Sequence, residues 1–491
     1  MNRRNLPPNL AALAKSIEAV ARGHGLDFFP VVFELLDARD VNAVAAFGGF
    51  PLRFPSWRFG MEFERLEKGR NWGLSKIYEL VINNDPTIAY LVSSNTAMEQ
   101  KLVMAHVFGH ADFFKHNLWF APTDRRMANR MADHGERVRR YMDAFGQDAV
   151  EEFLDLALSL DGLIDPYAAL RGHLRELGQA RDGIARRDEV ESPSERARKS
   201  LERAARSPLE ETRFGPFAPP ARTRLEPGRS GLDVLGFLAE EAPLERWQRD
   251  VLRMVRDEAL YFAPQRMTKV MNEGWASFWH SRILTEGVLA PTEIIDFADC
   301  HSGATATAPG QLNPYKLGID LFRWAERKGM DLFRLRRVHN DATFLDELVD
   351  EEFAQRSELF VQGHNSRTGR VEILDRDWRK VKEQLLLEMA NGGLPRIELA
   401  DDDHEGRGEL LLRHLHDGRD LQLDAAATCL RGIQRLWRRP VHLVTRLGEE
   451  ERRMVADDEC VRTLDPKPKA QAGAEDSAGE VGPKERSEAS A

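Results

Sequence analysis

Across residues 10–355, apolar positions recur every three or four residues, which is the spacing of one face of an α-helix. The segment 186–230 is an exception, because arginines and prolines replace the long apolar faces there. The rest of this region is therefore expected to be mainly helical, with helices within residues 10–40, 125–185 and 232–353.

Two stretches interrupt the helical pattern. Residues 46–70 set aromatic side chains among glycines and prolines, which break regular elements, so we expect a packed loop there. Thr87–Val92 is rich in β-branched and aromatic residues and follows a turn signal, so we expect a strand. After this strand, Thr96 and Glu99 stand at the spacing of a capping box, which predicts a helix that runs through His110.

The pattern changes after residue 369. We expect strands at 396–399, 409–414 and 441–445, and helices over Trp378–Met389 and Leu423–Trp437. Short strands and helices in this order predict a small C-terminal α/β domain over residues 370–463. The predicted fold class is therefore α+β and mainly α-helical, with a large helical N-terminal domain before the small one.

Two segments lack the apolar spacing of a hydrophobic core. Residues 186–230 are expected to form a mobile Arg/Pro-rich insertion. Residues 464–491 carry no aromatic side chain and mix acidic with basic residues, which predicts a disordered tail. The helical domain then comprises residues 1–185 and 231–360.

Composition and charge exclude several classes of protein. Hydrophobic residues make up 42% of the chain and charged residues 31%, which supports a core within a charged surface. The net charge of −10 disfavours non-specific nucleic-acid binding, which depends on neutralising phosphates. No apolar run approaches the ~18 residues of a membrane span, and none follows the basic N-terminus as in a secretory signal. The 3 cysteines lie far apart and predict no disulfide framework, so we expect a cytoplasmic protein.

The most specific chemical signal is a pair of histidines. His106 and His110 are four residues apart in a predicted helix, so both imidazoles lie on one face, about one turn apart. That arrangement holds one metal ion in HExxH proteins, and a strand just before the helix is also typical of zincins, so the large helical N-terminal domain is expected to be zincin-like. Two histidines that pack beside a core would give the same spacing, so the pair alone leaves both interpretations open.

A second segment strengthens the metal hypothesis. Glu273 lies in the sequence Asn-Glu-Gly-Trp-Ala, which resembles the helix that supplies the third ligand, a glutamate, in gluzincins. His106, His110 and Glu273 would then leave a fourth position open, and zinc is the expected ion. About 160 residues separate the two segments, against a short spacing in the usual motif. A buried glutamate that accepts a backbone hydrogen bond is the alternative for Glu273.

One departure from HExxH affects the chemistry. The motif has a glutamate directly after the first histidine, as the general base, whereas this chain has Val107. His280, two turns after Glu273 on the same helix face, is the candidate to handle protons, although a structural role fits it equally. Asp112 and His116 lie nearby in sequence, and Glu258 is a candidate partner that would orient a ligand histidine.

Several ordered blocks of the chain resemble the SpoVR family, named after stage V sporulation protein R. One block is the segment His106-x-x-Gly109-His110. The resemblance runs from about residue 10 to 460. The other blocks that carry it are Asp233–Leu238, Trp247–Asp250, Tyr261–Gln265, Asn272–Ala276 and Asn313–Gly318.

The resemblance implies a cytoplasmic bacterial or archaeal protein. In spore formers the family is tied to formation of the spore cortex, which is peptidoglycan, and elsewhere it is linked to stress physiology. Its members are often encoded near a PrkA-type serine kinase and a von Willebrand-A-like protein, which are therefore the expected partners. The family often has asparagine where this chain has His116, which argues against an essential histidine at that position.

Two functions of different classes follow. The first is a zincin-like metal-dependent hydrolase acting on an amide, in which His106, His110 and Glu273 bind zinc and His280 handles protons. The second is a non-catalytic partner or scaffold in a PrkA-type serine kinase complex, in which the same site is structural. Val107 favours the second function, and the segment around Glu273 favours the first.

Overall fold

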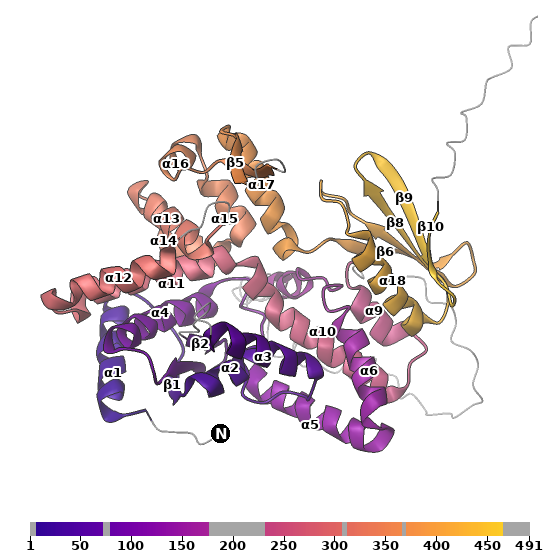
Figure 1. Ribbon diagram of the computed structural model, residues 1–491, viewed down its shortest axis with the longest axis horizontal. Helices are drawn as coiled ribbons and strands as arrows, with labels where there is room; N and C mark the ends of the chain where they lie inside the picture. The colour runs from indigo at the N-terminus through magenta and orange to yellow at the C-terminus, as the bar shows by residue number, and fades with distance from the viewer. Residues whose placement is uncertain (1–5, 72–78, 176–230, 307–311, 366–369, 465–491) are drawn as a thin grey trace, which may run out of the picture.

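The computed structural model describes residues 6–71, 79–175, 231–306, 312–365 and 370–464. Helices dominate these ranges, and sheets of three, five and two strands accompany them, so the mainly helical α+β class is confirmed (Figure 1). The predicted insertion 186–230 and the predicted tail, apart from Leu464 at the end of the last strand, lie outside the described residues. Among the described residues, no helix is both long and apolar enough to cross a membrane.

The helical part of the molecule contains most of the regular elements. Its helices are α1 (Pro8–Gly23), α2 (Ala38–Ala46), α3 (Trp57–Asn71), α4 (Ala97–His116), α5 (Met127–Phe145), α6 (Gln147–Leu158), α9 (Val234–Glu241), α10 (Arg246–Met267), α11 (Lys269–Ile283), α12 (Ile294–Thr305), α13 (Pro314–Arg327), α14 (Leu332–Val338), α15 (Asp341–Leu348), α16 (Glu351–Arg356) and α17 (Trp378–Met389).

The helix predicted over residues 10–40 is wrong beyond α1. The chain turns at Gly25, where φ is +88°, a left-handed conformation that favours glycine. It then enters strand β1 (Val31–Leu36), and α2 begins after Asp37, whose side chain accepts a hydrogen bond from the backbone N–H of Asp40. The apolar run of β1 forms a strand because it pairs with a distant segment.

The packed loop predicted over residues 46–70 is correct only for its first part. Phe50 and Phe54 are buried there, as aromatic side chains in a packed loop should be. From Trp57 onward the chain forms α3, in which Trp57 and Met61 are exposed. The aromatic residues of this second part therefore belong to a helix.

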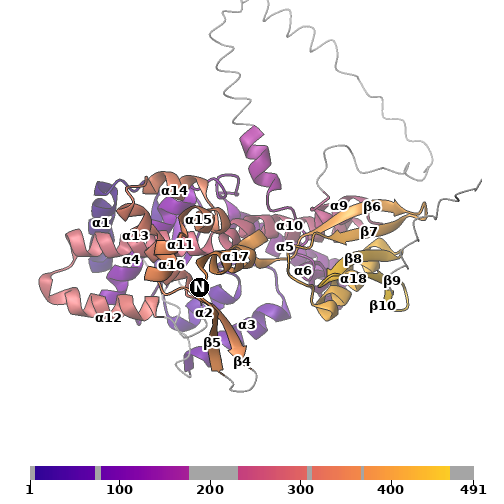
Figure 2. The same ribbon diagram turned by 90° about the horizontal axis from the view of Figure 1, so that it is seen from above.

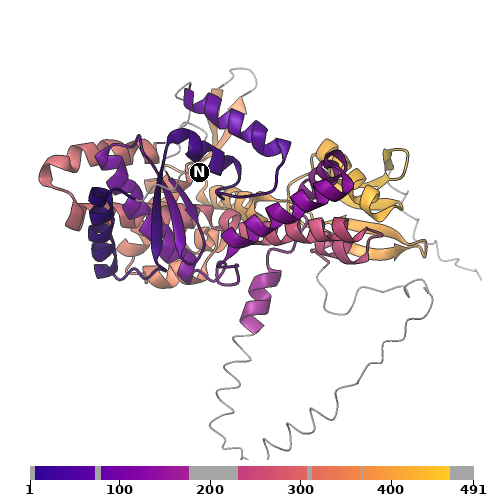
Figure 3. The same cartoon turned by 90° about the horizontal axis from the view of Figure 1, so that it is seen from below.

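The predicted strand Thr87–Val92 is present as β3, the central strand of the three-stranded sheet. It pairs parallel with β1 and antiparallel with β2 (Glu79–Ile82) (Figure 3, indigo and purple strands). Ala89 and Leu91 contribute to the largest buried cluster, which also contains residues of α1, α4, α11 and α13. The sheet thus supports the helix that follows it, α4.

The C-terminal unit is a five-stranded sheet with one helix, and its elements are β6 (Ile397–His404), β7 (Glu409–His414), α18 (Leu423–Trp437), β8 (Val441–Leu447), β9 (Glu450–Ala456) and β10 (Val461–Leu464). The strand order is β10-β9-β8-β7-β6, in which β7 and β8 are parallel and the other pairs are antiparallel. Because β7 and β8 are parallel, α18 makes the crossover between them.

The C-terminal sheet shares a hydrophobic core with the helical part. Leu410, Leu443 and Ile433 of this unit belong to one buried cluster with Phe153 of α6 and Leu238 of α9. Figure 1 shows α18 of this unit beside α9. The unit predicted over residues 370–463 therefore continues the core of its neighbours.

Helix α17, which the sequence analysis assigned to the C-terminal unit, lies with the helical part. Its buried residues Val381 and Leu385 join the cluster around α4 and α11, and the helix contacts α15 and α16. The preceding hairpin of β4 (Val361–Asn365) and β5 (Arg370–Asp375) extends away from α17 (Figure 2). The five-stranded sheet starts only at Ile397.

Candidate metal centre

Helix α4 carries the histidine pair, and it begins at the capping box that the sequence predicts. The Thr96 side chain accepts from the backbone N–H of Glu99, and the Glu99 side chain accepts from the backbone N–H of Thr96. This capping box marks where the helix begins, and within it His106 and His110 lie one turn apart, with ring centroids 4.5 Å apart and the rings nearly perpendicular. Both imidazoles are buried.

Helix α11 carries Glu273 and lies directly against α4. Gly109 of α4 faces Ala276 of α11 so closely that a Cβ on Gly109 would stand 2.7 Å from the Cα of Ala276. Gly274 faces Gly318 of α13 in the same way, since a Cβ on Gly274 would stand 2.4 Å from the Cα of Gly318. Glycine is needed at these crossings because only the absence of side chains lets the helices approach this far.

The first turn of α11 is held by a carboxylate from another helix. Asp341 of α15 is fully buried, and it accepts hydrogen bonds from the backbone N–H groups of Val270 at 2.9 Å and Met271 at 2.8 Å. These N–H groups have no partner within a helix, so Asp341 satisfies them. The contact fixes where α11 begins and hence where Glu273 points.

Replacement of this carboxylate tests how much it contributes. Asp341→Ala is expected to lower the free energy of unfolding by about 2 kcal/mol, because it leaves two buried N–H groups without an acceptor. Asp350→Ala, the control, removes an ordinary cap that accepts from Phe353 at the start of α16 and should cost about 1 kcal/mol. Urea unfolding measures both values, and equal losses would contradict the special role of Asp341.

The structure brings the three predicted ligand residues together. The Nε2 atoms of His106 and His110 each lie 3.5 Å from Oε2 of Glu273. All three ligand atoms lie within 4.8 Å of one another. In a tetrahedral shell with zinc–ligand bonds of about 2.0–2.1 Å, neighbouring ligand atoms are about 3.3–3.4 Å apart. The separations to the glutamate therefore match a shared ion.

The other ring nitrogens fix how the imidazoles are presented. Nδ1 of His110 lies 3.0 Å from Oδ1 of Asn272, an amide oxygen that can only accept, so Nδ1 donates and Nε2 keeps its lone pair. Nδ1 of His106 lies 2.9 Å from Nδ1 of His280, whose Nε2 lies 2.9 Å from Nδ1 of His301. If His106 donates to His280, and His280 to His301, Nε2 of His106 also faces Glu273 with a lone pair.

Protonation states agree with this arrangement. Burial and, to a smaller extent, the neighbouring His106 lower the pKa of His110 to about 4. Burial also lowers the pKa of His280 well below its ordinary value, and the histidines around it act in the same direction. Burial raises the pKa of Glu273, but His110 and His106 outweigh it, so the pKa stays below its ordinary value. The site thus combines neutral imidazoles at His110 and His280 with an ionised carboxylate at Glu273, and a divalent metal requires ligands in these states.

A further observation supports a cation between these groups. Oε2 of Glu273 is buried and has no hydrogen-bond partner of good geometry among the described residues. A buried carboxylate oxygen without such a partner is costly, and an ion at the shared point would satisfy it. The three side chains therefore fit a divalent metal, and zinc suits two imidazoles and one carboxylate.

The residue expected to orient a ligand histidine is not Glu258. Glu258 is buried elsewhere, where it accepts from Nδ1 of His134 at 2.9 Å and from Arg53. The prediction was wrong because spacing in sequence does not indicate which side of α10 faces α4. Asn272 and His280 perform the contacts that Glu258 was expected to make.

The other nearby candidates lie apart from the three ligands. Asp112 accepts from the backbone of Asp27, from Nε1 of Trp275 and from Arg336. His116 contacts Asp27 near the end of α4. Both therefore serve packing between helices and a surface loop.

Three contributors to the site were not assigned a role by the sequence interpretation, namely Asn272, His301 and Tyr315. Asn272 and Tyr315 lie in blocks that resemble the SpoVR family, which was their only signal. Tyr315 hydrogen-bonds to Glu273, and its ring is stacked on His106 with centroids 6.1 Å apart. His301 belongs to α12, whose contact with α11 no local pattern indicates.

Comparison with known proteins identifies the family. The chain matches the family model for SpoVR like protein over residues 5–394 and the model for the SpoVR-like C-terminal domain over residues 395–447. The chain belongs to the SpoVR family. The two matched regions meet between α17 and β6, where the five-stranded sheet begins.

A SpoVR-family relative extends over nearly the same length. The uncharacterized protein YcgB of Escherichia coli (strain K12) is 30% identical over 466 residues, which cover 86% of this chain and 88% of that protein. No solved structure shows significant similarity to the chain. The candidate metal centre thus lies within the larger SpoVR region.

Proposed function

We propose that this SpoVR-family chain is a metal-dependent hydrolase of amide bonds, with zinc held by His106, His110 and Glu273. One observation carries the proposal: donor atoms from two helices far apart in sequence lie together, with both Nε2 atoms 3.5 Å from the carboxylate oxygen. A histidine pair on one helix and a glutamate on another is the ligand set of zincins. The family name links the chain to sporulation, so amides of cortex peptidoglycan, or of peptidoglycan precursors, are the proposed substrates.

The residues around the ligands limit how protons can move. A bound ion supplies Lewis acidity that polarises the carbonyl group of the amide. Val107 is fully buried at the position of the usual catalytic glutamate. His280 faces the far side of the His106 ring, so its role under this proposal is to position His106. Among the described residues around the ligands, Tyr315 touches both Glu273 and His106 and is the group that can transfer a proton.

Tyr315 completes the reaction without a carboxylate base. In hydrolysis, a water oxygen bonds to the carbonyl carbon, the carbon–nitrogen bond breaks, and the amine leaves with one added proton. The phenol of Tyr315 donates that proton to the leaving nitrogen and regains one from the attacking water. Because a phenol is a poor base near neutral pH, turnover should be about 10²–10⁴-fold slower than with a glutamate.

Metal analysis tests the ligand set. Full-length protein loaded with zinc and dialysed should retain about one equivalent, as a set of three protein ligands predicts. His106→Ala and Glu273→Ala should retain little. His116→Asn, the matched control, changes a histidine on the same helix that contacts Asp27 and should retain as much as wild type. Equal metal content in all four proteins would refute the site.

An activity assay separates catalysis from binding. Zinc-loaded wild type incubated with soluble muropeptides should release new amine groups, and Tyr315→Phe should bind zinc normally but react about 10²-fold more slowly. Equal rates for the two proteins would remove Tyr315 from the mechanism. No release by any zinc-loaded protein would refute hydrolysis of this substrate class while leaving the metal site intact.

A second candidate function is a structural metal site in a scaffold for a PrkA-type serine kinase complex. The buried Val107 favours it, because a hydrolase of this pattern normally has a glutamate there. In that case zinc-loaded protein would bind the kinase or its von Willebrand-A-like neighbour and show no hydrolysis. Loss of that binding in His106→Ala would then connect the ion to assembly.

A further inference from the structure

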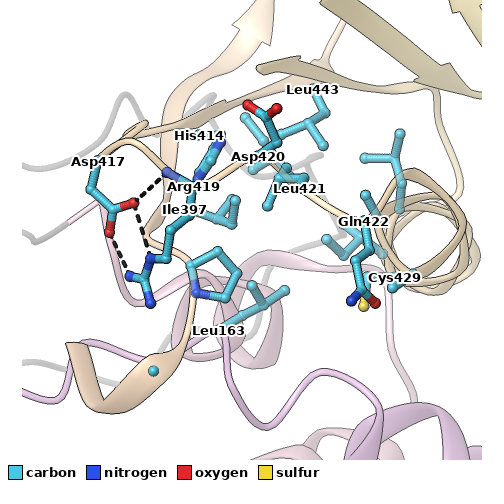
Figure 4. A pocket seen from close by; sticks show the side chains of 17 residues that line it. Leu163, Ile397, His414, Asp417, Arg419, Asp420, Leu421, Gln422, Cys429 and Leu443 are labelled. Atoms are coloured by element: carbon cyan, nitrogen blue, oxygen red, sulfur yellow. Dashed lines mark hydrogen bonds and ion pairs between the residues drawn. The ribbon is translucent and has the colours of Figure 1, made fainter. Parts of the chain in front are cut away.

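A cavity of about 380 Å³ lies in the C-terminal unit, between its sheet and α18 (Figure 4). Its walls are mostly apolar, with Ile397, Leu412 and Leu443 from the strands and Leu430 and Ile433 from the helix. This volume is within the range of pockets that bind small molecules. At about 30 Å³ for a water-sized group, it accommodates roughly a dozen non-hydrogen atoms.

One end of the cavity carries polar groups, and His414 is the most buried of them, with 6% of its surface exposed. Its Nδ1 lies 3.0 Å from Oγ1 of Thr445, whose hydroxyl donates to the carbonyl of Arg446. Nδ1 therefore donates to Thr445, and Nε2 carries a lone pair. Among the described residues, Nε2 forms no hydrogen bond, so this acceptor in the wall of the cavity is available to a bound molecule.

The charge at this end is negative. Asp420 accepts from Nε2 of His416 and from the backbone of Gly448, both at 3.0 Å. The backbone N–H of Gly418 donates to Nδ1 of His416, so Nε2 of His416 is the nitrogen that donates to Asp420. Asp420 and His414 both line the cavity.

The cation nearest to this end is already engaged. Arg419 pairs with Asp417, and it also donates to the carbonyl of Ala390. Figure 4 shows this pair at the side of the cavity, with Asp417 accepting from Arg419. Arg419 is the only lysine or arginine among the residues that line the cavity, so a ligand carboxylate or phosphate would meet the carboxylate of Asp420 without gaining an unpaired cation.

We propose that the cavity binds a small amphipathic amine. The apolar body of the amine fills the space between sheet and α18, and its ammonium group donates to Nε2 of His414 and to Asp420. The site is separate from the metal centre, because every residue that lines it belongs to the C-terminal unit or to the segments next to it, such as Leu163 and Pro395. Since Leu163 follows α6, a bound amine also strengthens the contact between the sheet and the helical part.

Calorimetric titration of the full chain with two matched probes tests the proposal. 2-Phenylethylamine carries an ammonium group and 3-phenylpropionate a carboxylate on a similar apolar body. The amine should bind at least about tenfold more tightly than the carboxylate, because only the amine can donate to His414 and Asp420. Equal affinities, or no detectable binding of the amine, would overturn the proposal.

Variants show whether the interaction is with Asp420. Asp420→Asn should weaken binding of the amine about tenfold. Asp424→Asn, the matched control, removes the same charge from an exposed position on α18 that does not line the cavity, and it should leave the affinity unchanged. The same affinity in wild type and Asp420→Asn would contradict the assigned position of the ammonium group.

A native cysteine locates the bound probe. Cys429 lines the cavity, whereas Cys300 and Cys460 lie elsewhere in the chain. Saturating amine should slow alkylation of Cys429 at least about fivefold, as measured by mass spectrometry, and leave the other two rates unchanged. Calorimetric binding without protection of Cys429 would show that the amine occupies another site, and the proposal would fail.

Discussion

Gly274→Ala is expected to destabilise the protein by about 3 kcal/mol or more, and to weaken zinc binding at the same time. A methyl group at this position would stand 2.4 Å from the Cα and carbonyl carbon of Gly318. Both neighbours are backbone atoms, so no side chain can rotate away. Helices α11 and α13 would have to separate, which would move Glu273 relative to the histidines on α4. The midpoint of urea unfolding and the zinc affinity measure the two effects.

Another helical glycine gives the control for this substitution. Gly60 of α3 has no atom within 4 Å of the position that a Cβ would occupy. Gly60→Ala should therefore raise stability by up to about 1 kcal/mol, because alanine favours the helix more than glycine does. A Gly274→Ala protein with the unfolding midpoint and zinc affinity of wild type would show that the crossing of α11 and α13 is not tight.

Metal-free protein is expected to lose about 3 kcal/mol of stability between pH 6.5 and pH 4 through His110 alone. Burial lowers the pKa of His110 to about 4 in the folded state, while an unfolded chain titrates near the ordinary value of 6.5. As the pH falls from 6.5 towards 4, His110 binds a proton in the unfolded state but not in the folded state. The contribution is therefore fully present above pH 6.5 and lost as the pH approaches 4.

Urea unfolding at a series of pH values, with a chelator present, measures this loss. His110→Gln removes the titrating group, so its stability should fall less steeply between pH 6.5 and pH 4. Identical profiles for wild type and His110→Gln would contradict a buried, neutral His110.

Local signals in the sequence were enough to predict the part of the site that lies on α4. The capping box of Thr96 and Glu99 and the spacing of His106 and His110 depend only on residues within a few turns. The same holds for β7 and α18, which begin and end at the residues predicted for them, 409–414 and 423–437. Such elements carry their own start and stop signals.

The errors concern segments whose structure depends on distant partners. The run Val31–Leu36 is apolar without a clear period, and it forms a strand because β3 pairs with it. Glu258 was expected beside the histidines, but the orientation of α10 places it against His134. None of these contacts is encoded within one window of the chain.

The separation of the ligand helices along the chain has a kinetic consequence. Asn272, next to Glu273, meets His110 across 162 residues of sequence. Closing so long a loop costs entropy before any contact forms, so the complete ligand set is absent from the unfolded chain and is assembled only after α4 and α11 dock. A bound ion would then stabilise the native state but not the transition state for folding. It would therefore slow unfolding and leave the rate of folding nearly unchanged. In cells, zinc supply would in that case affect the lifetime of the folded protein more than the rate at which the protein folds.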